Sequence, residues 1–427
     1  MKQLTSEKLL DGIRFHSVSE DRFKTTRLSV VFYVPLEART VSKYALLSRI
    51  LIRTCEKYPD FTALSKKLSA LYGASLSADC FKVGDRLGIL FSVSGIDDRY
   101  ALDNECISKE LSELMCEILF KPKVSSSAFD EEELIQSKRE LIDLIDSELN
   151  EKRIYALQRA NEIMCEGEAF ATSRLGTGSG AESVTAEELY QAWRDMISTA
   201  VIEIFYIGES SPAFSKDTFK SFFFEAQRTP VSLSNTVVRT ADRVKTAEEE
   251  MELSQSKMIL GFRCDCAEPE ENVTAFRLMV AVLGGTAHSK LFNNVREKLS
   301  LCYYCAARFN RQKGIMTVDS GVETANIEKA KEAILNEIKA IQDGDVTDFE
   351  LESAKMSVIN SFNEMNDTAA SIEGWYLSQM FDGRIYTADE LSEKISSVTK
   401  EEIITASKKL TLDTVYVLKG VMKEDEE

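Results

Sequence analysis

Histidine is nearly absent from this sequence. Only two occur among 427 residues, His16 and His288, and most of the chain separates them. Zinc sites are commonly built from histidines three or four residues apart, since this spacing places both imidazoles on one face of a helix. The sequence therefore offers no histidine pair for a metal ion, and we expect His288 to be an ordinary turn residue.

Long apolar runs and prolines are also scarce. No stretch approaches the ~18 apolar residues of a bilayer-spanning helix, and the first residues, MKQLTSEKLLDGIRF, carry too many charges for a signal peptide. Six prolines and 19 glycines are too few for a disordered chain. These absences predict a cytoplasmic globular protein with no membrane partner, and the length predicts two domains.

Basic residues are outnumbered by acidic ones. The chain has 52 Lys and Arg against 70 Asp and Glu, a formal net charge of −18. A nucleic-acid-binding surface requires clustered Lys and Arg, so no nucleic acid partner is expected. The acidic excess would suit a basic peptide, and a solvated surface explains it equally well.

Nine cysteines include two close pairs, Cys264 with Cys266 and Cys302 with Cys305. The second pair has C-x-x-C spacing, which is typical of zinc and redox sites. Both pairs lie in apolar, strand-like segments that lack the turn residues of a zinc knuckle. We expect reduced thiols packed as small apolar side chains, with a metal or redox role as the alternative.

The two halves of the chain resemble each other. SVTAEELYQAW begins at residue 183 and SVTKEEIITAS at residue 397, half the chain apart. In both copies a threonine precedes a glutamate by three positions, which predicts a capping box at the start of a helix. Weaker matches pair residues near 132 with those near 349, and near 66 with those near 297. The sequence therefore predicts two copies of one α+β domain, each a mixed or antiparallel sheet packed with helices.

A polar, irregular stretch separates these copies. Residues 211–245 contain Pro212 and Pro230 with many Ser and Thr, and they predict an exposed connector with one short helix at 216–226. The predicted domains are thus 1–210 and 246–427. Two similar domains joined in this way commonly face each other across a cleft.

One segment, residues 283–313, combines several signals. Gly284 and Gly285 follow an apolar helical pattern and predict a left-handed helix cap. A short amphipathic helix then ends near Arg296, and a strand containing Tyr303 pairs through a hairpin with residues 315–322. Judged by spacing alone, Arg296 is a surface arginine and Tyr303 a half-buried strand residue.

The phrase LGG-x-x-x-S-K-LF-x-x-VREK-x-x-L-x-Y, residues 283–303, resembles the C-terminal-domain motif of the pitrilysin/insulinase and mitochondrial-processing-peptidase family of zinc peptidases. The resemblance implies a clamshell of two similar α+β domains that encloses a peptide substrate. It also implies that Arg296 and Tyr303, with Gly284 and Gly285 beside them, are substrate-binding residues.

The zinc motif of that family is missing here. In the family, a helix of the first domain carries H-x-x-E-H, and the five corresponding residues are Ala45, Leu46, Leu47, Ser48 and Arg49. The third ligand, a glutamate, would fall within residues 143–148, whose carboxylates we expect on a solvated helix face. The chain is therefore expected to hold no metal and to have no catalytic residue of its own.

Together these features predict a non-catalytic subunit. The expected partner is a zinc-bearing relative in a heteromeric zinc metalloendopeptidase, to which this chain would supply Arg296 and Tyr303 as hydrogen-bond donors. One alternative is a peptide-binding or scaffolding protein without any hydrolytic role. Another is an enzyme with a cysteine nucleophile, although no cysteine lies near either histidine in the sequence.

Overall fold

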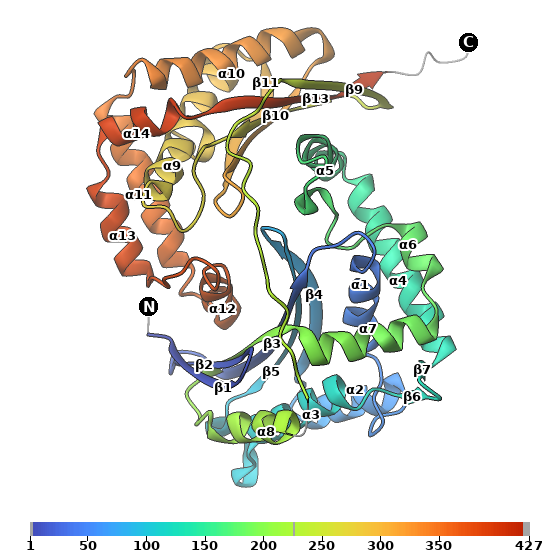
Figure 1. The fold of residues 1–427 in the computed structure, drawn as a ribbon. Coiled ribbons are helices and arrows are strands. Elements are labelled where there is room, and N and C mark those ends of the chain that lie inside the picture. The colour runs from blue at the N-terminus through green and yellow to red at the C-terminus, as the bar shows by residue number, and fades with distance from the viewer. Residues whose placement is uncertain (1–2, 225–226, 422–427) are drawn as a thin grey trace.

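The computed structural model describes residues 3–224 and 227–421. It consists of two α+β halves, each a main sheet with helices packed on it, and they lie one above the other (Figure 1). The predicted fold class is therefore confirmed. The predicted domain limits at residues 1 and 427 and the predicted helix end at residue 226 lie outside the described residues.

The first sheet has six strands in the order β1-β2-β8-β3-β5-β4. Neighbouring strands are antiparallel except β2 and β8, which run parallel. The strands are β1 (Thr5–Leu10), β2 (Ile13–Ser19), β3 (Thr25–Pro35), β4 (Ser75–Val83), β5 (Arg86–Ile96) and β8 (Val201–Gly208), and a separate short hairpin joins β6 (Val124–Ser125) to β7 (Ala128–Phe129).

Strand β3 is buried along most of its length because both faces of its sheet are covered. Val30 and Phe32 enter the core formed with the helices of this half, whereas Val31 and Tyr33 enter a core shared with the second half. Successive side chains of a strand point to opposite faces. A strand buried on both faces therefore has a continuous apolar run instead of an alternating pattern.

The helices of the first half and the connector are α1 (Val41–Ile50), α2 (Phe61–Ala70), α3 (Ile107–Phe120), α4 (Glu131–Asn150), α5 (Lys152–Met164), α6 (Gly178–Ser183), α7 (Ala186–Thr199) and α8 (Ala213–Phe224). The connector helix α8 begins three residues earlier than predicted, directly after Pro212. No helix among the described residues has both the length and the apolar character needed to cross a bilayer.

The second sheet repeats the first. Its order, β11-β12-β10-β13-β9, matches β4-β5-β3-β8-β2, and its last pair, β13 and β9, is again parallel. The two predicted capping boxes are present, at Thr185 before α7 and at Thr399 before α14. The duplication is therefore confirmed. The strands are β9 (Lys245–Glu252), β10 (Ser256–Arg263), β11 (Cys302–Asn310), β12 (Ile315–Val322) and β13 (Thr411–Val421).

The second half has two π-helical segments in addition to its α-helices. The first, Ala281–Gly285, continues α9, and the second, Leu291–Lys298, leads into β11. The α-helices are α9 (Val273–Val280), α10 (Ile327–Gln342), α11 (Asp348–Glu364), α12 (Ala369–Leu377), α13 (Ala388–Ser397) and α14 (Lys400–Ser407).

In each half, one helix packs against the sheet of the other half. Helix α5 lies against the second sheet, where Ala156 and Ala160 pack on Ile259, Tyr416 and Leu418 (Figure 1). Helix α12 of the second half contacts β3 and β8 of the first sheet. The internal repeat in the sequence predicts the two domains. It does not predict this exchange of helices, because the residues in contact are distant in sequence and no local sequence pattern marks them.

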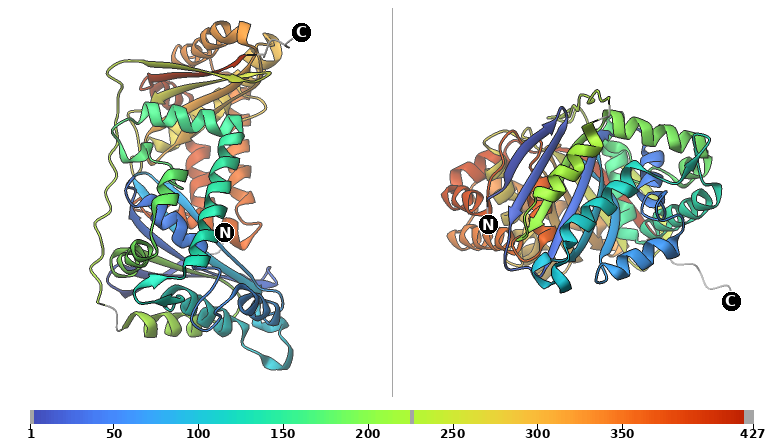
Figure 2. Two further views of the ribbon diagram at one scale, coloured as in Figure 1. Left: turned by 90° about the vertical axis from the view of Figure 1, so that its right-hand side faces the viewer. Right: turned by 90° about the horizontal axis from the view of Figure 1, so that it is seen from below.

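The connector runs as an extended segment along one side of the molecule (Figure 2, left). It was predicted to be exposed, yet the Asn235 side chain holds both halves. Its oxygen accepts a bond from the Asp85 backbone N–H in the β4–β5 turn (3.1 Å), and its amide donates to the Gln312 carbonyl in the β11–β12 turn (2.7 Å). The domain boundaries at 210 and 246 themselves stay predictions.

Candidate functional site

Arg296 and Tyr303 line the same surface cavity. Arg296 lies in the π-helical segment before β11, and Tyr303 is the second residue of that strand. The chain turns tightly between them, with the Leu301 N–H bonded to the Val295 carbonyl at 3.2 Å. The cavity has a volume of about 400 Å³ and is lined by Arg296, Glu297, Ser300, Leu301, Cys302, Tyr303 and Glu323.

Both side chains keep their polar ends accessible. Arg296 is 40% exposed, rests on the Phe292 ring (4.7 Å to its centroid) and approaches Glu297 only to 3.6 Å. Tyr303 is 61% exposed, and its hydroxyl donates a long hydrogen bond of 3.4 Å to Glu323. Such weak internal contacts leave the guanidinium and the phenol able to donate to a ligand. Their role in substrate binding stays a prediction.

The left-handed cap predicted at Gly284 and Gly285 was wrong. The helix continues as a π-helical turn, and Gly284 has φ −157° and ψ 18°. Glycine is needed at position 284 because β11 passes close to it. A Cβ atom there would lie 2.8 Å from the Ala307 nitrogen and 2.7 Å from Cδ1 of Leu291.

Replacing Gly284 by alanine should lower the free energy of unfolding by about 1–3 kcal/mol, because the added methyl group overpacks a backbone contact. Urea unfolding followed by circular dichroism measures this change. Gly285→Ala is the matched control, since its Cβ would come no closer than 3.4 Å to a neighbouring atom. Equal destabilisation by both variants would contradict the close-approach explanation.

Helix α1 does not present metal ligands at the positions that the resemblance assigns to zinc. Ala45, Leu46 and Leu47 are buried in the core, and the Ser48 hydroxyl donates to the Ala45 carbonyl at 2.8 Å. Arg49 follows, and its buried Nε has no hydrogen-bond partner among the described residues. A guanidinium at the second histidine position repels a cation instead of binding it.

The expected third ligand is also engaged elsewhere. Asp143 and Asp146 are exposed as predicted, but Glu148 is partly buried and forms a two-pronged ion pair with Arg174 at 2.9 and 2.5 Å. Burial raises the pKa of the nearby Cys80 thiol to about 12, although Ser48, Arg49 and Arg174 lower it. A protonated thiol, two guanidinium groups and a neutralised carboxylate do not fit a zinc ion.

Arg174 was missed by sequence reasoning. It lies 26 residues beyond Glu148, in the segment between α5 and α6, and no motif marks it. One indirect indication was available: without the two histidines and their zinc ion, a partly buried Glu148 requires another cationic partner.

The described residues do not support the two cysteine alternatives, a metal or redox site and a cysteine nucleophile. Cys302 and Cys305 are both buried in β11, where a hydrogen bond between the thiols lowers the pKa of Cys302 and raises that of Cys305. Among the residues that the structure describes, no three His, Cys, Asp or Glu side chains gather as a metal site. Buried His16 hydrogen-bonds to Ser6 (2.7 Å) and Glu203 (2.6 Å), not to a cysteine.

Comparison with known proteins agrees with this geometry. A family described as "Peptidase M16 inactive domain" matches residues 183–358. The chain is 30% identical to the "Probable inactive metalloprotease YmfF" of Bacillus subtilis over 96% of both chains, and 24% identical to the "Uncharacterized zinc protease YmxG" of the same species over 54% of this chain and 56% of that one.

A solved structure has the same fold over the full length of the chain. The crystal structure of a conserved protein from Enterococcus faecalis superposes with a TM-score of 0.92 and 27% identity, and the match covers 99% of this chain and all of that one. Full-length identity at this level, together with the replaced metal positions in α1, leads to one conclusion. The chain belongs to the M16 peptidase family, among its inactive homologues.

Proposed function

We propose that this chain is the non-catalytic subunit of a heteromeric peptidase whose zinc is held by a related partner subunit. The observation that carries the proposal is the contrast between its two sites. The metal positions of α1 have become apolar or cationic, whereas Arg296 and Tyr303 share an accessible cavity with few internal contacts.

In the proposed complex, Arg296 and Tyr303 act on a peptide bond that lies next to the partner's zinc. A guanidinium and a phenol both donate hydrogen bonds, and such donors stabilise a carbonyl oxygen as negative charge develops on it. Tyr303 belongs to β11, the edge strand of the second sheet. An extended peptide could add to this edge as a further strand, which would align its carbonyl groups with the cavity.

Zinc-bearing relatives of a suitable kind exist, since one of the similar Bacillus proteins is named a zinc protease. A partner of this kind would be expected to carry the H-x-x-E-H motif that this chain lacks. The division of labour then assigns the metal to one subunit and the Arg and Tyr side chains to the other.

The test is reconstitution with a zinc-bearing relative from the same genome, beginning with any such relative encoded next to this chain. Each protein alone should cleave a quenched fluorescent peptide library slowly or not at all, and the mixture should form a stable complex with at least about tenfold higher activity. A chelator should abolish that activity, because the partner's zinc carries the chemistry.

Two results would count against this proposal. If no zinc-bearing relative binds the chain, the heteromeric assembly is wrong. If a complex forms but its peptidase activity equals that of the partner alone, the chain is a peptide-binding or scaffolding protein instead.

A further inference from the structure

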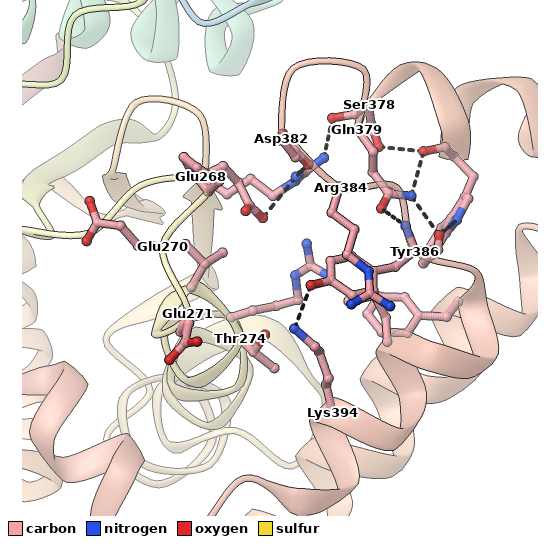
Figure 3. Close-up of a pocket in the computed structure, with 18 of the residues that line it drawn as sticks. Glu268, Glu270, Glu271, Thr274, Ser378, Gln379, Asp382, Arg384, Tyr386 and Lys394 are labelled. Carbon is pink, nitrogen blue, oxygen red and sulfur yellow. Dashed lines mark hydrogen bonds and ion pairs between the residues drawn. The ribbon is translucent and has the colours of Figure 1, made fainter. Parts of the chain in front are cut away.

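A second cavity, separate from that of Arg296 and Tyr303, is lined only by residues of the second half. It has a volume of about 600 Å³, which is within the range of small-molecule sites. The loop before α9, helices α9, α11, α12 and α13, and the loop after α12 enclose it (Figure 3). None of its residues lines the cavity of Arg296 and Tyr303.

Most charged groups of this cavity are already paired. Arg311 bonds to Glu268 at 3.0 Å and also binds Asp382 and the Ser378 carbonyl. Arg384 donates to Glu390 at 3.1 Å (Figure 3 shows its position beside Tyr386). Arg311 and Arg384 are thus held by carboxylates of the walls and are not free to bind a ligand, while Glu268 and Asp382 share the single positive charge of Arg311.

Two cations of this cavity form no ion pair with any residue that the structure describes. Arg277 of α9 forms no hydrogen bond or ion pair with any described residue, and its guanidinium only approaches the Phe362 ring, at 5.3 Å. Burial and then the charge of Arg311 lower its pKa to about 10, while the charges of Glu268 and Asp382 act in the opposite direction, so the guanidinium stays charged at neutral pH. Lys394 donates to the Tyr386 hydroxyl at 2.9 Å but has no carboxylate partner in the described chain.

An apolar wall lies beside these cations. Phe362 and Trp375 pack edge to face, with ring centroids 5.1 Å apart, and both are almost fully buried. The Trp375 indole N–H donates to the Tyr386 carbonyl at 2.8 Å, which fixes the ring. A preformed aromatic surface next to a free guanidinium suits a ligand with one anionic group and one apolar group.

The cavity also opens toward the region between the two halves. A neighbouring cavity of about 570 Å³ shares Arg277, Arg311 and Ser378 with it and is also lined by Gly285 and by residues 82–84 of the first half. A chain lying between the halves could therefore reach Arg277 with its end.

We propose that this cavity binds the free carboxylate at the C-terminus of a peptide whose last side chain is apolar. Arg277 pairs with the carboxylate through two parallel hydrogen bonds, Lys394 adds a second positive charge, and Phe362 and Trp375 receive the side chain. The peptide nature of the ligand rests on the proposed function, whereas the carboxylate rests on the unpaired Arg277 alone.

A carboxylate fits better than a phosphate. Glu271 lies at the rim with no ion-pair partner among the described residues, and Glu268 and Glu270 lie nearby. Their negative charges repel a doubly charged phosphate more strongly than a singly charged carboxylate. The formal net charge of −18 acts in the same direction.

The experiment uses the full-length chain alone and one probe in two forms. The probe is an N-terminally fluorescein-labelled peptide of four alanines followed by phenylalanine, prepared as the free acid and as the C-terminal amide. Fluorescence anisotropy should show binding of the acid and at least about tenfold weaker binding of the amide, since a hydrogen-bonded charge pair is lost. N-acetyl-phenylalanine should displace the acid better than inorganic phosphate does.

Two variants test the site itself. Arg277→Met should weaken binding of the acid at least about tenfold. Gly374→Leu should do the same without touching Arg277, because a Cβ at this exposed helical glycine of α12 meets no atom within 4 Å and the larger side chain would fill the cavity. Gly178→Leu, at another glycine that faces open space, is the matched control and should bind like the original chain.

The proposal fails if acid and amide bind equally, if neither binds, if phosphate competes better, or if both variants bind normally. Because no partner subunit is present, these outcomes are independent of the reconstitution experiment. If reconstitution fails but the chain alone still binds the acid peptide specifically, the carboxylate site is supported and only the heteromeric peptidase is contradicted.

Discussion

Replacing Lys313 by methionine should lower the free energy of unfolding by about 3–5 kcal/mol, the cost of breaking a buried ion pair on one side. Lys313 is fully buried in the β11–β12 turn. Its ammonium group lies 2.8 Å from Asp85 of the first half and 3.1 Å from Glu168, and it also donates to the Thr236 carbonyl of the connector. Methionine fills a similar volume but leaves both carboxylates without this cation.

Urea unfolding of the full-length chain, followed by circular dichroism and tryptophan fluorescence, measures the change. Lys339→Met is the matched control: its ammonium group pairs with Asp343 on the surface of α10, where 64% of the lysine side chain is exposed. Exposed pairs contribute only about 0–1 kcal/mol. A Lys313 variant as stable as the control would show that this contact does not hold the halves together.

Other ion pairs and hydrogen bonds also join the two halves. Buried Glu373 of α12 accepts hydrogen bonds from Arg27 (2.5 Å) and Ser29 of β3, and Arg153 of α5 pairs with Asp319 of β12 at 2.6 Å. Helices α5 and α12 are therefore each held against the sheet of the other half by ion pairs as well as by apolar packing. The two halves are therefore expected to unfold together instead of as separate domains.

Local signals in the sequence predicted the repeated unit well. A capping box needs only residues within one turn of helix, so Thr185 and Thr399 could be read directly and are confirmed. The β11–β12 hairpin was equally readable, because its strands are adjacent in sequence. The replacement of the zinc ligands also needed only one short stretch, Ala45 to Arg49.

Features made by distant residues could not be predicted in this way. The exchange of α5 and α12, the Arg174–Glu148 pair and the unpaired Arg277 depend on which segments meet in the folded chain. The wrong prediction at Gly284 has the same origin. Glycine has two common uses, a positive φ and a close approach, and only the position of Ala307 on β11 distinguishes them.

If the heteromeric peptidase forms, Arg296→Ala should lower its kcat by about 10²–10³, the usual cost of removing a donor to a developing oxyanion. Tyr303→Phe removes only the phenol hydroxyl and should cost less, at least about tenfold. Steady-state kinetics of the reconstituted complex measure both values. A fall in kcat at unchanged KM would indicate transition-state stabilisation, whereas a raised KM alone would indicate ground-state binding of the peptide.

Two controls separate this role from a structural one. Arg194→Ala and Tyr100→Phe alter exposed residues of the first half, far in sequence from the candidate cavity, and should leave kcat unchanged. Arg296 and Tyr303 are themselves accessible and weakly bonded within the chain, so their removal should not lower stability by more than about 0.5 kcal/mol. A large loss of activity in a complex of unchanged stability then requires that these side chains meet the substrate, because they hold no other part of the fold in place.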